Sequence, residues 1–428
     1  MVRPELLTLW ENISNYRQAD FDERRQEIIR FLRENGVTYN IYDAPEGSER
    51  MWKLDPIPQV FTSEEWKILS AGLRQRARLF SRLLTDIYDQ QELIYKGIVA
   101  PDALFNHDGY QRSCYQSIPQ NGLKVYAVDV ARDKKGGFYV VNDKTQAPSG
   151  IGYTLENRIA MRNNLPELFE GYNICRLTEF TNFFQQTLSA FSNNKDQDPR
   201  VVLLTPGQHN ETFFEHAYLA ATFGFNLVQG EDLIAKDGFV WLKTLSGLEK
   251  VDVILRRVDD IYCDPLELFA ESKLGVPGIL EVVRQGNVSI ANPIGSYVLE
   301  NPALLPFLPN ICRHFFAEEL LMPSISTWWC GQEKELDYVM DNLDSLIVKK
   351  VNHHPGEPVY FGESLSKEQK EELINILKTR GHKYYAQANI QYSGTPNYID
   401  GSIVSRQTIF RFFLVENNGD YEIMPGGL

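Results

Sequence analysis

Val201-Val202-Leu203-Leu204-Thr205-Pro206-Gly207 begins the strand–helix–strand unit that indicates the fold class. Four consecutive aliphatic residues without polar alternation are typical of a strand that is buried on both faces of a parallel sheet. The run ends in a Pro-Gly turn, after which a helix is expected from Phe213 to Thr222, with Gly224 as its end. A second strand is expected from Phe225 to Val228. This strand–helix–strand order indicates an α/β arrangement.

The same order returns in the last third of the chain. Ser345 to Lys349 predicts a strand, and the capping-box spacing of Ser366-Lys367-Glu368-Gln369 predicts a helix that stops at Gly381. Tyr384 to Ala388 predicts the returning strand. Between the two units, a hairpin turn at Asp237-Gly238 precedes a further buried strand at Val251 to Leu255.

Near Lys124 the spacing of apolar residues changes from the helical period to the alternation that is typical of strands. Alternating residues predict two strands, one carrying Asp129 and the other Asp143, joined by a turn at Lys134 to Gly137. A helical stretch is expected from Asn164 to Phe191.

The first hundred residues are predicted to be mostly helical. One helix is expected from Phe21 to Asn35 with Gly36 as its cap, and a longer one begins with a capping box at Thr62. The basic stretch from Arg74 to Arg78 lies on the longer helix. It is interpreted as a solvated or salt-bridged face, with anion binding as the alternative.

Composition excludes several classes of protein. The chain has 428 residues, with 43 Lys plus Arg against 57 Asp plus Glu, which gives a net charge of −14 and argues against a binder of nucleic-acid backbones. A 43% hydrophobic content is enough for a large core, and no apolar run is long enough to span a membrane. Residues 1–12 lack the apolar stretch of a signal peptide. Five scattered cysteines without Cys-x-x-Cys spacing suit a reducing cytoplasm, where we expect the protein to act.

Three clusters of polar residues are candidates for chemistry. The first joins Asp129 and Asp143 with Glu156 and Asn157, oxygen ligands of the kind that Mg²⁺ takes beside substrate phosphates; turn hydrogen bonds explain Asp143 about equally well. The second is Lys349 at a strand end, where an ammonium group can hold a phosphate, although most such lysines are plain surface charges.

The third cluster follows the two buried strands. It combines acidic, basic and amide side chains that suit a zwitterionic or peptide-like ligand, although an internal salt-bridge network would explain them nearly as well. Its members are Asn210, Glu211, Glu215, His216, Arg256, Arg257, Asp259 and Asp260. No second ligand stands at metal spacing from His216, which excludes a zinc site. Motifs of serine hydrolases, P-loop enzymes and dinucleotide binders do not occur in the sequence.

Several longer sequence motifs resemble those of the circularly permuted ATP-grasp proteins, which are often labelled glutathionylspermidine-synthase-like. The resemblance covers essentially the whole chain. It rests on Trp52-Lys53-Leu54-Asp55-Pro56-Ile57-Pro58, Gly72-Leu73-Arg74-Gln75-Arg76-Ala77-Arg78, Thr145-Gln146-Ala147-Pro148-Ser149-Gly150, Leu155-Glu156-Asn157-Arg158, Leu204-Thr205-Pro206-Gly207, Asn210-Glu211-Thr212-Phe213-Phe214-Glu215-His216 and Leu255-Arg256-Arg257-Val258-Asp259-Asp260.

The resemblance implies an α/β fold with α+β elements: a permuted ATP-grasp with a helical N-terminal region and an inserted α/β substrate domain. The expected divisions are a helical region at 1–112, a metal-binding part at 113–195, a substrate domain at 196–310 and a nucleotide-binding part at 311–428. Proteins of this family usually continue beyond the motif at the end of this chain, Met424-Pro425-Gly426-Gly427-Leu428.

The family's metal-binding motif has its nearest match at Asp143-Lys144-Thr145, where Thr145 replaces an asparagine. This departure leaves the third metal ligand open among Gln146, Glu156 and Asn157. Lys349 matches the family's phosphate-binding lysine, with Lys350 where a proline would stand.

The implied activity is an ATP- and Mg²⁺-dependent ligase that joins a carboxylate to an amine through an acyl phosphate. The nucleotide would contact Lys349, Lys350, Gln387 and Gly362. The arginines proposed to stabilise the acyl phosphate are Arg132, Arg158, Arg256 and Arg257. The substrates would be small molecules or peptides. The alternative is a catalytically inactive relative that serves as a nucleotide- or peptide-binding partner, favoured by the altered metal-binding motif.

Overall fold

The computed structural model describes residues 16–40, 50–119, 122–193, 198–354 and 356–428. The expectation about a signal peptide at residues 1–12 lies outside these ranges. None of the described helices is both long and apolar enough to cross a membrane.

The described helices are α2 (Gln18–Glu34), α3 (Ser63–Tyr88), α4 (Glu92–Tyr95), α5 (Pro101–Phe105), α6 (Ile151–Asn164), α7 (Pro166–Gly171), α8 (Thr178–Ala190), α9 (Phe213–Phe223), α10 (Ile279–Arg284), α11 (Leu308–Phe316), α12 (Glu333–Asp341) and α13 (Lys367–Arg380). The described strands are β1 (Thr38–Tyr39), β2 (Arg50–Met51), β3 (Val125–Arg132), β4 (Phe138–Lys144), β5 (Val201–Leu204), β6 (Asn226–Val228), β7 (Leu233–Lys236), β8 (Phe239–Thr244), β9 (Gly247–Val251), β10 (Val253–Arg256), β11 (Ser289–Ala291), β12 (Thr327–Trp329), β13 (Leu346–Lys350), β14 (Tyr360–Phe361), β15 (Tyr384–Ala388), β16 (Gly394–Ile399), β17 (Ser402–Gln407), β18 (Ile409–Asn417) and β19 (Asp420–Ile423).

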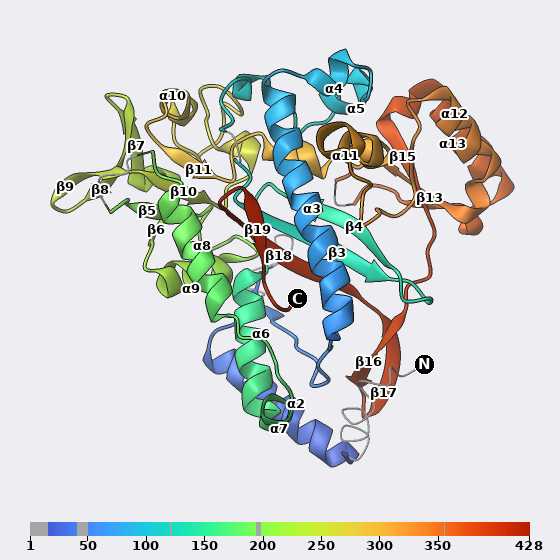
Figure 1. Cartoon of the computed structure of the whole chain (residues 1–428), viewed down its shortest axis with the longest axis horizontal. Coiled ribbons are helices and arrows are strands. Elements are labelled where there is room, and N and C mark those ends of the chain that lie inside the picture. The colour runs from blue at the N-terminus through green and yellow to red at the C-terminus, as the bar shows by residue number, and fades with distance from the viewer. Residues whose placement is uncertain (1–15, 41–49, 120–121, 194–197, 355) are drawn as a thin grey trace.

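A central antiparallel sheet joins the middle of the chain to its end, in the order β19-β18-β3-β4. The predicted hairpin forms its β3–β4 pair, and β18 lies on the other side of β3. Helix α3 crosses in front of this sheet in Figure 1. One face carries Tyr126 and Val128 into the core shared with α3, whereas the other carries Val125 and Ala127 into the core formed with α6 and α8.

Strand β5, the expected strand at Val201–Leu204, lies inside a parallel sheet with the order β11-β10-β5-β6. Every pairing in it is parallel, so the expected parallel strand–helix–strand unit is confirmed. Gly224 ends α9 in the left-handed conformation, with a φ of +70°. The expected strand at Val251 to Leu255 is divided by the structure: Val251 ends the antiparallel strand β9 and Val253 begins β10.

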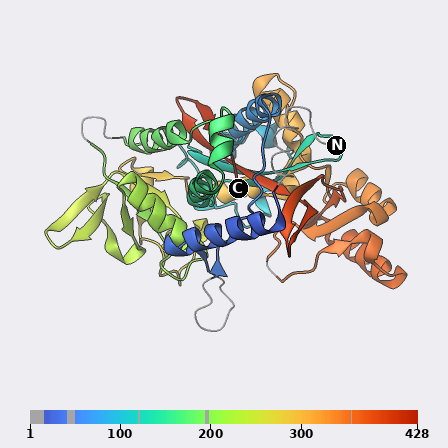
Figure 2. The same cartoon turned by 90° about the horizontal axis from the view of Figure 1, so that it is seen from below.

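A second antiparallel sheet has the order β12-β15-β13-β14 and is covered on one face by α12 and α13. Figures 1 and 2 show the central sheet between this sheet and the parallel one. The returning strand is found where it was expected, at Tyr384–Ala388. The mixed α/β fold class is therefore confirmed.

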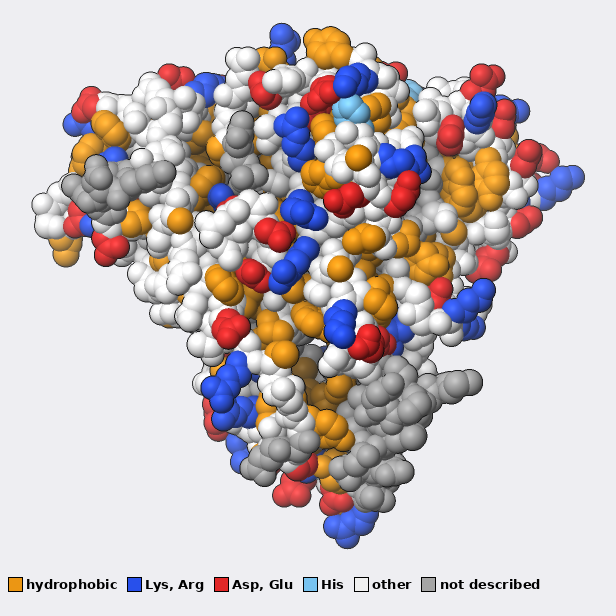
Figure 3. Space-filling model, in the orientation of Figure 1, with side chains coloured by type: hydrophobic (Ala, Val, Ile, Leu, Met, Phe, Trp, Pro, Cys, Tyr) orange, Lys and Arg blue, Asp and Glu red, His pale blue; other side chains and the backbone are white. Residues whose placement is uncertain are grey.

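One helical prediction needs correction, and one is confirmed. The stretch expected from Asn164 to Phe191 contains two helices, α7 and α8, and the last residue of α6, which already begins at Ile151 because Gly150 ends the preceding loop with a φ of +124°. The basic stretch of α3 is salt-bridged, as expected: Arg74 and Arg78 pair with Glu422 and Asp420, and the fully buried Arg76 pairs with Asp143. On the face that carries α3, Figure 3 shows basic and acidic side chains interspersed.

The capping box predicted at Thr62 is present. The Thr62 hydroxyl accepts a hydrogen bond from the Glu65 backbone N–H at 3.2 Å, and the Glu65 carboxylate accepts one from the Thr62 backbone N–H at 2.9 Å. These bonds satisfy two donors that the first turn of α3 would otherwise leave open.

We therefore expect Thr62→Ala to lower the free energy of unfolding by about 1 kcal/mol, because the N-cap acceptor is lost. Denaturant titration of the full chain measures the change. Thr62→Ser keeps a hydroxyl and serves as the control. A Thr62→Ala variant as stable as the Thr62→Ser variant would contradict the role of the cap.

Candidate active site

Asp129 and Asp143 lie on neighbouring strands but point to opposite faces of the central sheet. In the β3–β4 register Asp129 is paired with Asn142, and Asp143 is paired with Val128. Paired residues share a face of a sheet and successive residues alternate between faces. The expectation that the two carboxylates share a metal ion is therefore wrong.

Asp143 belongs to a buried ion pair with α3. The Arg76 guanidinium donates from Nε and Nη2 to the two carboxylate oxygens of Asp143, both at 2.7 Å. The Tyr126 hydroxyl donates to the same carboxylate, and Arg76 Nη2 also donates to Ser324 Oγ at 2.9 Å. This network joins α3, the central sheet and the segment that leads into β12.

Asp129 lies on the other face, paired with Arg411 of β18. Arg411 donates from Nε to Oδ1 at 2.7 Å and from Nη2 to Oδ2 at 3.0 Å. Its Nη1 lies 3.3 Å from the Ser149 carbonyl oxygen, to which it donates. Sequence reasoning missed Arg411, although a single charge in the apolar run Phe410-Arg411-Phe412-Phe413 is a signal for a buried or functional charge. Arg76 carried a similar signal, since it falls on the apolar stripe of its helix.

Glu156 and Asn157 extend from α6 toward other partners. Asn35 Nδ2 donates to Glu156 Oε2 at 3.4 Å, and Trp52 Nε1 donates to Asn157 Oδ1 at 3.0 Å. Both contacts fasten α6 to the N-terminal region. Within the residues that the structure describes, no three His, Cys, Asp or Glu side chains are arranged to hold a metal ion.

Arg256 is a fully buried structural side chain. It donates to the carbonyl oxygens of Asn292, Val258 and Pro293 at 2.8 to 3.0 Å, and it forms an ion pair with Asp260. The Asp260 carboxylate also accepts from the Tyr297 backbone N–H at 2.9 Å. Such a saturated guanidinium has little capacity left for a ligand.

Arg257 and Glu215 form a second buried pair, beneath the loop that precedes α6. Arg257 donates to the Pro148 carbonyl oxygen, and Glu215 Oε2 accepts from the backbone N–H groups of Gly150 and Gly152 at 2.5 and 3.3 Å. The closest ion-pair distance between the two side chains is 3.5 Å, from Nη2 to Oε1.

The cost of burying the charges of Arg257 and Glu215 is only partly compensated. Burial raises the pKa of the Glu215 carboxyl and lowers the pKa of Arg257, so their mutual attraction does not fully offset desolvation. Glu215 Oε1 and Arg257 Nε and Nη2 have no hydrogen bond among the described atoms. The pair holds the Pro148–Gly150 loop to the parallel sheet.

The loop after β10 meets the loop after β4. Gln146 Nε2 donates to Asp259 Oδ1 at 3.1 Å, and Gln146 Oε1 accepts from the Asp260 backbone N–H at 2.9 Å. Glu300 Oε1 accepts from the backbone N–H groups of Thr145 and Gln146 at 2.8 and 2.9 Å. The carboxyl ends of the parallel strands therefore adjoin the end of the central hairpin.

The three candidates before and within α9 are placed differently. Asn210 Oδ1 accepts from the Thr212 backbone N–H and hydroxyl, both at 3.0 Å, which makes it a local turn residue. Glu211 accepts from the Tyr39 hydroxyl at 3.0 Å. His216 is buried between the hydroxyls of Thr205 and Thr212, and burial holds its pKa well below the usual range. His216 is therefore a neutral packing residue.

Of the two further predicted arginines, Arg132 ends strand β3 and Arg158 lies on helix α6. Arg132 pairs with Glu65 at 3.2 Å and lies between the rings of Phe61 and Phe138. Arg158 donates to the carbonyl oxygens of Cys175 and Pro425, both at 2.9 Å. Both side chains hold neighbouring segments in place.

Lys349 and Gln387 share one face of the second antiparallel sheet. Ile347 is paired with Gln387 and Lys349 with Tyr385, so all four side chains lie opposite the face that α12 and α13 cover. Burial lowers the pKa of Lys349, whose half-buried ammonium has no hydrogen bond or ion pair in the described part of the chain. Gln387 Nε2 donates to Thr327 Oγ1 at 3.2 Å.

Lys350 and Gly362 have structural explanations instead. Lys350 alternates to the opposite face from Lys349 and pairs with Glu357 at 2.5 Å. A Cβ at Gly362 would lie 1.7 Å from the Leu343 carbonyl oxygen, so close packing requires the glycine. The structure thus separates Lys349 and Gln387 from the other two predicted nucleotide contacts.

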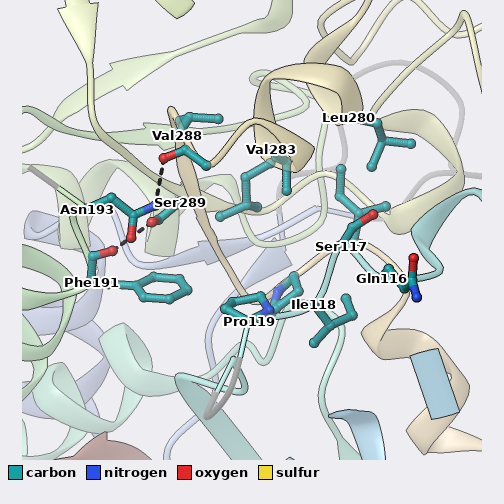
Figure 4. Close-up of a pocket in the computed structure, with 14 residues that line it drawn as sticks. Gln116, Ser117, Ile118, Pro119, Phe191, Asn193, Leu280, Val283, Val288 and Ser289 are labelled. Carbon is teal, nitrogen blue, oxygen red and sulfur yellow. Dashed lines mark hydrogen bonds between the residues drawn. The ribbon is translucent and has the colours of Figure 1, made fainter. Parts of the chain in front are cut away.

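A cavity of about 200 Å³ lies elsewhere, beside β11. Figure 4 shows Ile118, Pro119, Phe191 and Val283 around it, with Ser289 donating to the Phe191 carbonyl oxygen. Its lining includes none of the candidate residues described above. We therefore place the candidate site at the junction of the sheets.

Two antiparallel sheets, one bearing an unpaired lysine, together with an inserted parallel sheet, are the parts of an ATP-grasp protein in a permuted order. The sequence model of the family described as circularly permuted ATP-grasp type 2 matches residues 58–428. The chain belongs to this family. Membership suggests ATP-dependent ligase activity.

The chain is also similar to uncharacterized relatives and, in its fold, to a solved structure. An uncharacterized protein of Synechocystis sp. is 33% identical over 395 residues, which are 92% of this chain and 82% of the relative. An uncharacterized protein of Mycobacterium tuberculosis is 35% identical over all of this chain but only 49% of its own length, so this chain spans about half of that relative. A glutathione synthetase-like effector from Globodera pallida, solved in its apo form, has a TM-score of 0.64 at 13% identity and covers 97% of this chain and 94% of its own. That likeness concerns the fold alone.

The buried pair of Arg76 and Asp143 yields a stability prediction. Asp143→Ala should lower the free energy of unfolding by about 3–5 kcal/mol, because Arg76 is left buried without its counter-charge. Denaturant titration provides the measurement. Glu64→Ala, which removes the exposed partner of Lys67, is the control and should leave stability nearly unchanged. An Asp143→Ala variant as stable as the control would show that Arg76 and Asp143 are not coupled.

Proposed function

We propose that the protein binds a nucleoside triphosphate against the Lys349 face of the β12-β15-β13-β14 sheet and uses it to join a carboxylate to an amine through an acyl phosphate. The observation that carries this proposal is the Lys349 ammonium, which is half-buried and unpaired among the described residues. A phosphate group would supply the counter-charge that burial makes favourable. ATP-grasp membership supports the reaction class.

The neighbouring side chains suit the other parts of a nucleotide. Gln387 uses its amide N–H toward Thr327, which leaves its carbonyl oxygen to accept from the amino group of an adenine ring. Gln387 and Lys349 lie on the same face, two residues apart in register. This spacing lets one ligand contact both side chains.

The substrate is proposed to lie where the loops after β4 and β10 meet. Asp259 is exposed there and Glu211 is half-buried, so their carboxylates can attract a substrate amine. Arg257 positions the Pro148–Gly150 loop from beneath. In this proposal Arg257 acts as a positioning residue. Direct contact with the acyl phosphate is not assigned to it or to any other buried arginine.

The four residues predicted to bind Mg²⁺ do not fit that ion as a group. Asp129 and Asp143 are on opposite faces and each is paired in a bidentate manner with an arginine, whereas Glu156 and Asn157 fasten α6. Mg²⁺ requires converging oxygen ligands at about 2.1 Å. No step of the proposed function is assigned to it.

The same observation favours a second candidate. Because the predicted metal ligands are all engaged in structural contacts, the chain is also suited to a role as a nucleotide- or peptide-binding partner without turnover. ATP consumption in mixtures of candidate acids and amines separates the two candidates. ADP formation that requires both an acid and an amine supports the ligase, and binding without ADP formation supports the partner.

Lys349→Ala should abolish the rise in melting temperature that ATP causes in the native chain, because the phosphate loses its buried cation. Thermal melting with and without ATP provides the measurement. Lys350→Ala is the matched control, since its side chain lies on the opposite face and should leave the rise intact. An undiminished rise in Lys349→Ala would remove Lys349 from the nucleotide site.

A further inference from the structure

A row of side chains crosses three strands on one face of the central sheet. Arg411 on β18 is opposite Asp129 on β3, and Asp129 is opposite Asn142 on β4. Lys144 follows two residues after Asn142 and therefore lies on the same face. This is the position at which two strand carboxylates were expected, but the row contains one carboxylate and two cations.

The oxygens of the two carboxylates that contact this row, Asp129 and Glu300, are already engaged. Both oxygens of Asp129 accept from Arg411. Glu300, the neighbouring acid, accepts from two backbone N–H groups through Oε1 and from the Lys144 ammonium through Oε2 at 3.1 Å. A divalent cation would have to displace these donors and would then lie between an arginine and a lysine.

The unused hydrogen-bonding groups of the row are donors. Arg411 has five N–H groups, and the described contacts use three of them, toward Asp129 and Ser149. The Lys144 ammonium has three N–H groups and uses one of them, toward Glu300. The side chains of Arg411 and Lys144 are 27% and 37% exposed, so a ligand can reach both.

We infer that this row binds phosphate groups of the nucleotide directly, through Arg411 and Lys144, without a divalent cation between them. Guanidinium and ammonium groups with free N–H donors form charge-assisted hydrogen bonds with phosphate oxygens. The two side chains provide the positive charge that a metal ion would otherwise bring to a triphosphate. The inference rests on the nucleotide binding of the proposed function and holds for both candidate functions.

Thermal melting and calorimetric titration of the full chain test the inference, with ATP in EDTA and with ATP in excess Mg²⁺. We expect ATP to raise the melting temperature in EDTA at least as much as in Mg²⁺. Lys144→Gln should weaken ATP binding in EDTA about tenfold, the loss expected for one charge-assisted hydrogen bond. Lys135→Gln, in the exposed turn of the same hairpin, is the control and should bind ATP like the native chain.

Adenosine, which has no phosphate, should bind Lys144→Gln and the native chain equally. This arm separates a phosphate contact from a change elsewhere in the site. Arg411→Lys should also weaken ATP binding. If that variant fails to fold because Asp129 loses its bidentate partner, Lys144→Gln still decides the outcome.

Three results would overturn the inference. ATP binding that requires Mg²⁺ would show that a cation bridges the phosphates, while nucleotide binding itself would stand. Unchanged ATP affinity in Lys144→Gln would place the phosphates elsewhere, again with nucleotide binding intact. No ATP effect in either buffer would remove the proposed function together with the inference.

Discussion

The alternation of side chains along β3 and β4 determines which partners the two strand aspartates can reach. It sends Asp129 and Asp143 to opposite faces of the central sheet, where each meets an arginine from a different part of the chain. Arg76 comes from α3 and Arg411 from β18, which begins at Ile409. Both pairs are bidentate, the geometry in which arginine and carboxylate bind with the most specificity. Together they fix β4 to α3 and β3 to its neighbour β18.

The Arg76 pair has a second consequence for the site. Through Ser324 it reaches the segment before β12, the first strand of the sheet that carries Lys349. The backbone of this segment also pairs with β4, where Val140 accepts from the Ile325 N–H at 3.0 Å. The position of the proposed nucleotide site relative to the central sheet is therefore set by buried polar contacts, which are well defined in direction because unsatisfied partners are costly.

Buried charges also join the parallel sheet to the central one. Glu215 and Arg257 come from the two elements that follow β5 and β10, and both hold the Pro148–Gly150 loop. The proposed substrate site lies at the carboxyl ends of the parallel strands, as is usual for open α/β sheets. The arrangement places acidic Asp259 beside Gln146 and the cationic row of Arg411 and Lys144 on the neighbouring sheet face. A ligand with a cationic part and an anionic part matches this division of charge.

Elements whose signals are local could be predicted from the sequence. The buried strand at Val201, the capping boxes at Thr62 and Ser366, and the hairpin turn at Lys134 to Gly137 were predictable, because each depends on residues within a few positions of one another. The two strands that carry Lys349 and Gln387 were predictable in the same way, whereas their antiparallel pairing is a finding of the structure. The long sequence motifs also predicted membership of the circularly permuted ATP-grasp family.

Tertiary structure alone decided which charges face a ligand and which face each other. Arg76 and Arg411 lie far along the chain from their aspartates, so no local pattern reveals the pairs, and a shift of one residue in register would move either aspartate to the other face. Arg256, Arg257 and His216 looked like site residues in the sequence, yet the structure buries them as supports. A sequence gives the type of each side chain, but its burial and partners depend on how distant segments pack, and these determine whether a charge can bind a ligand.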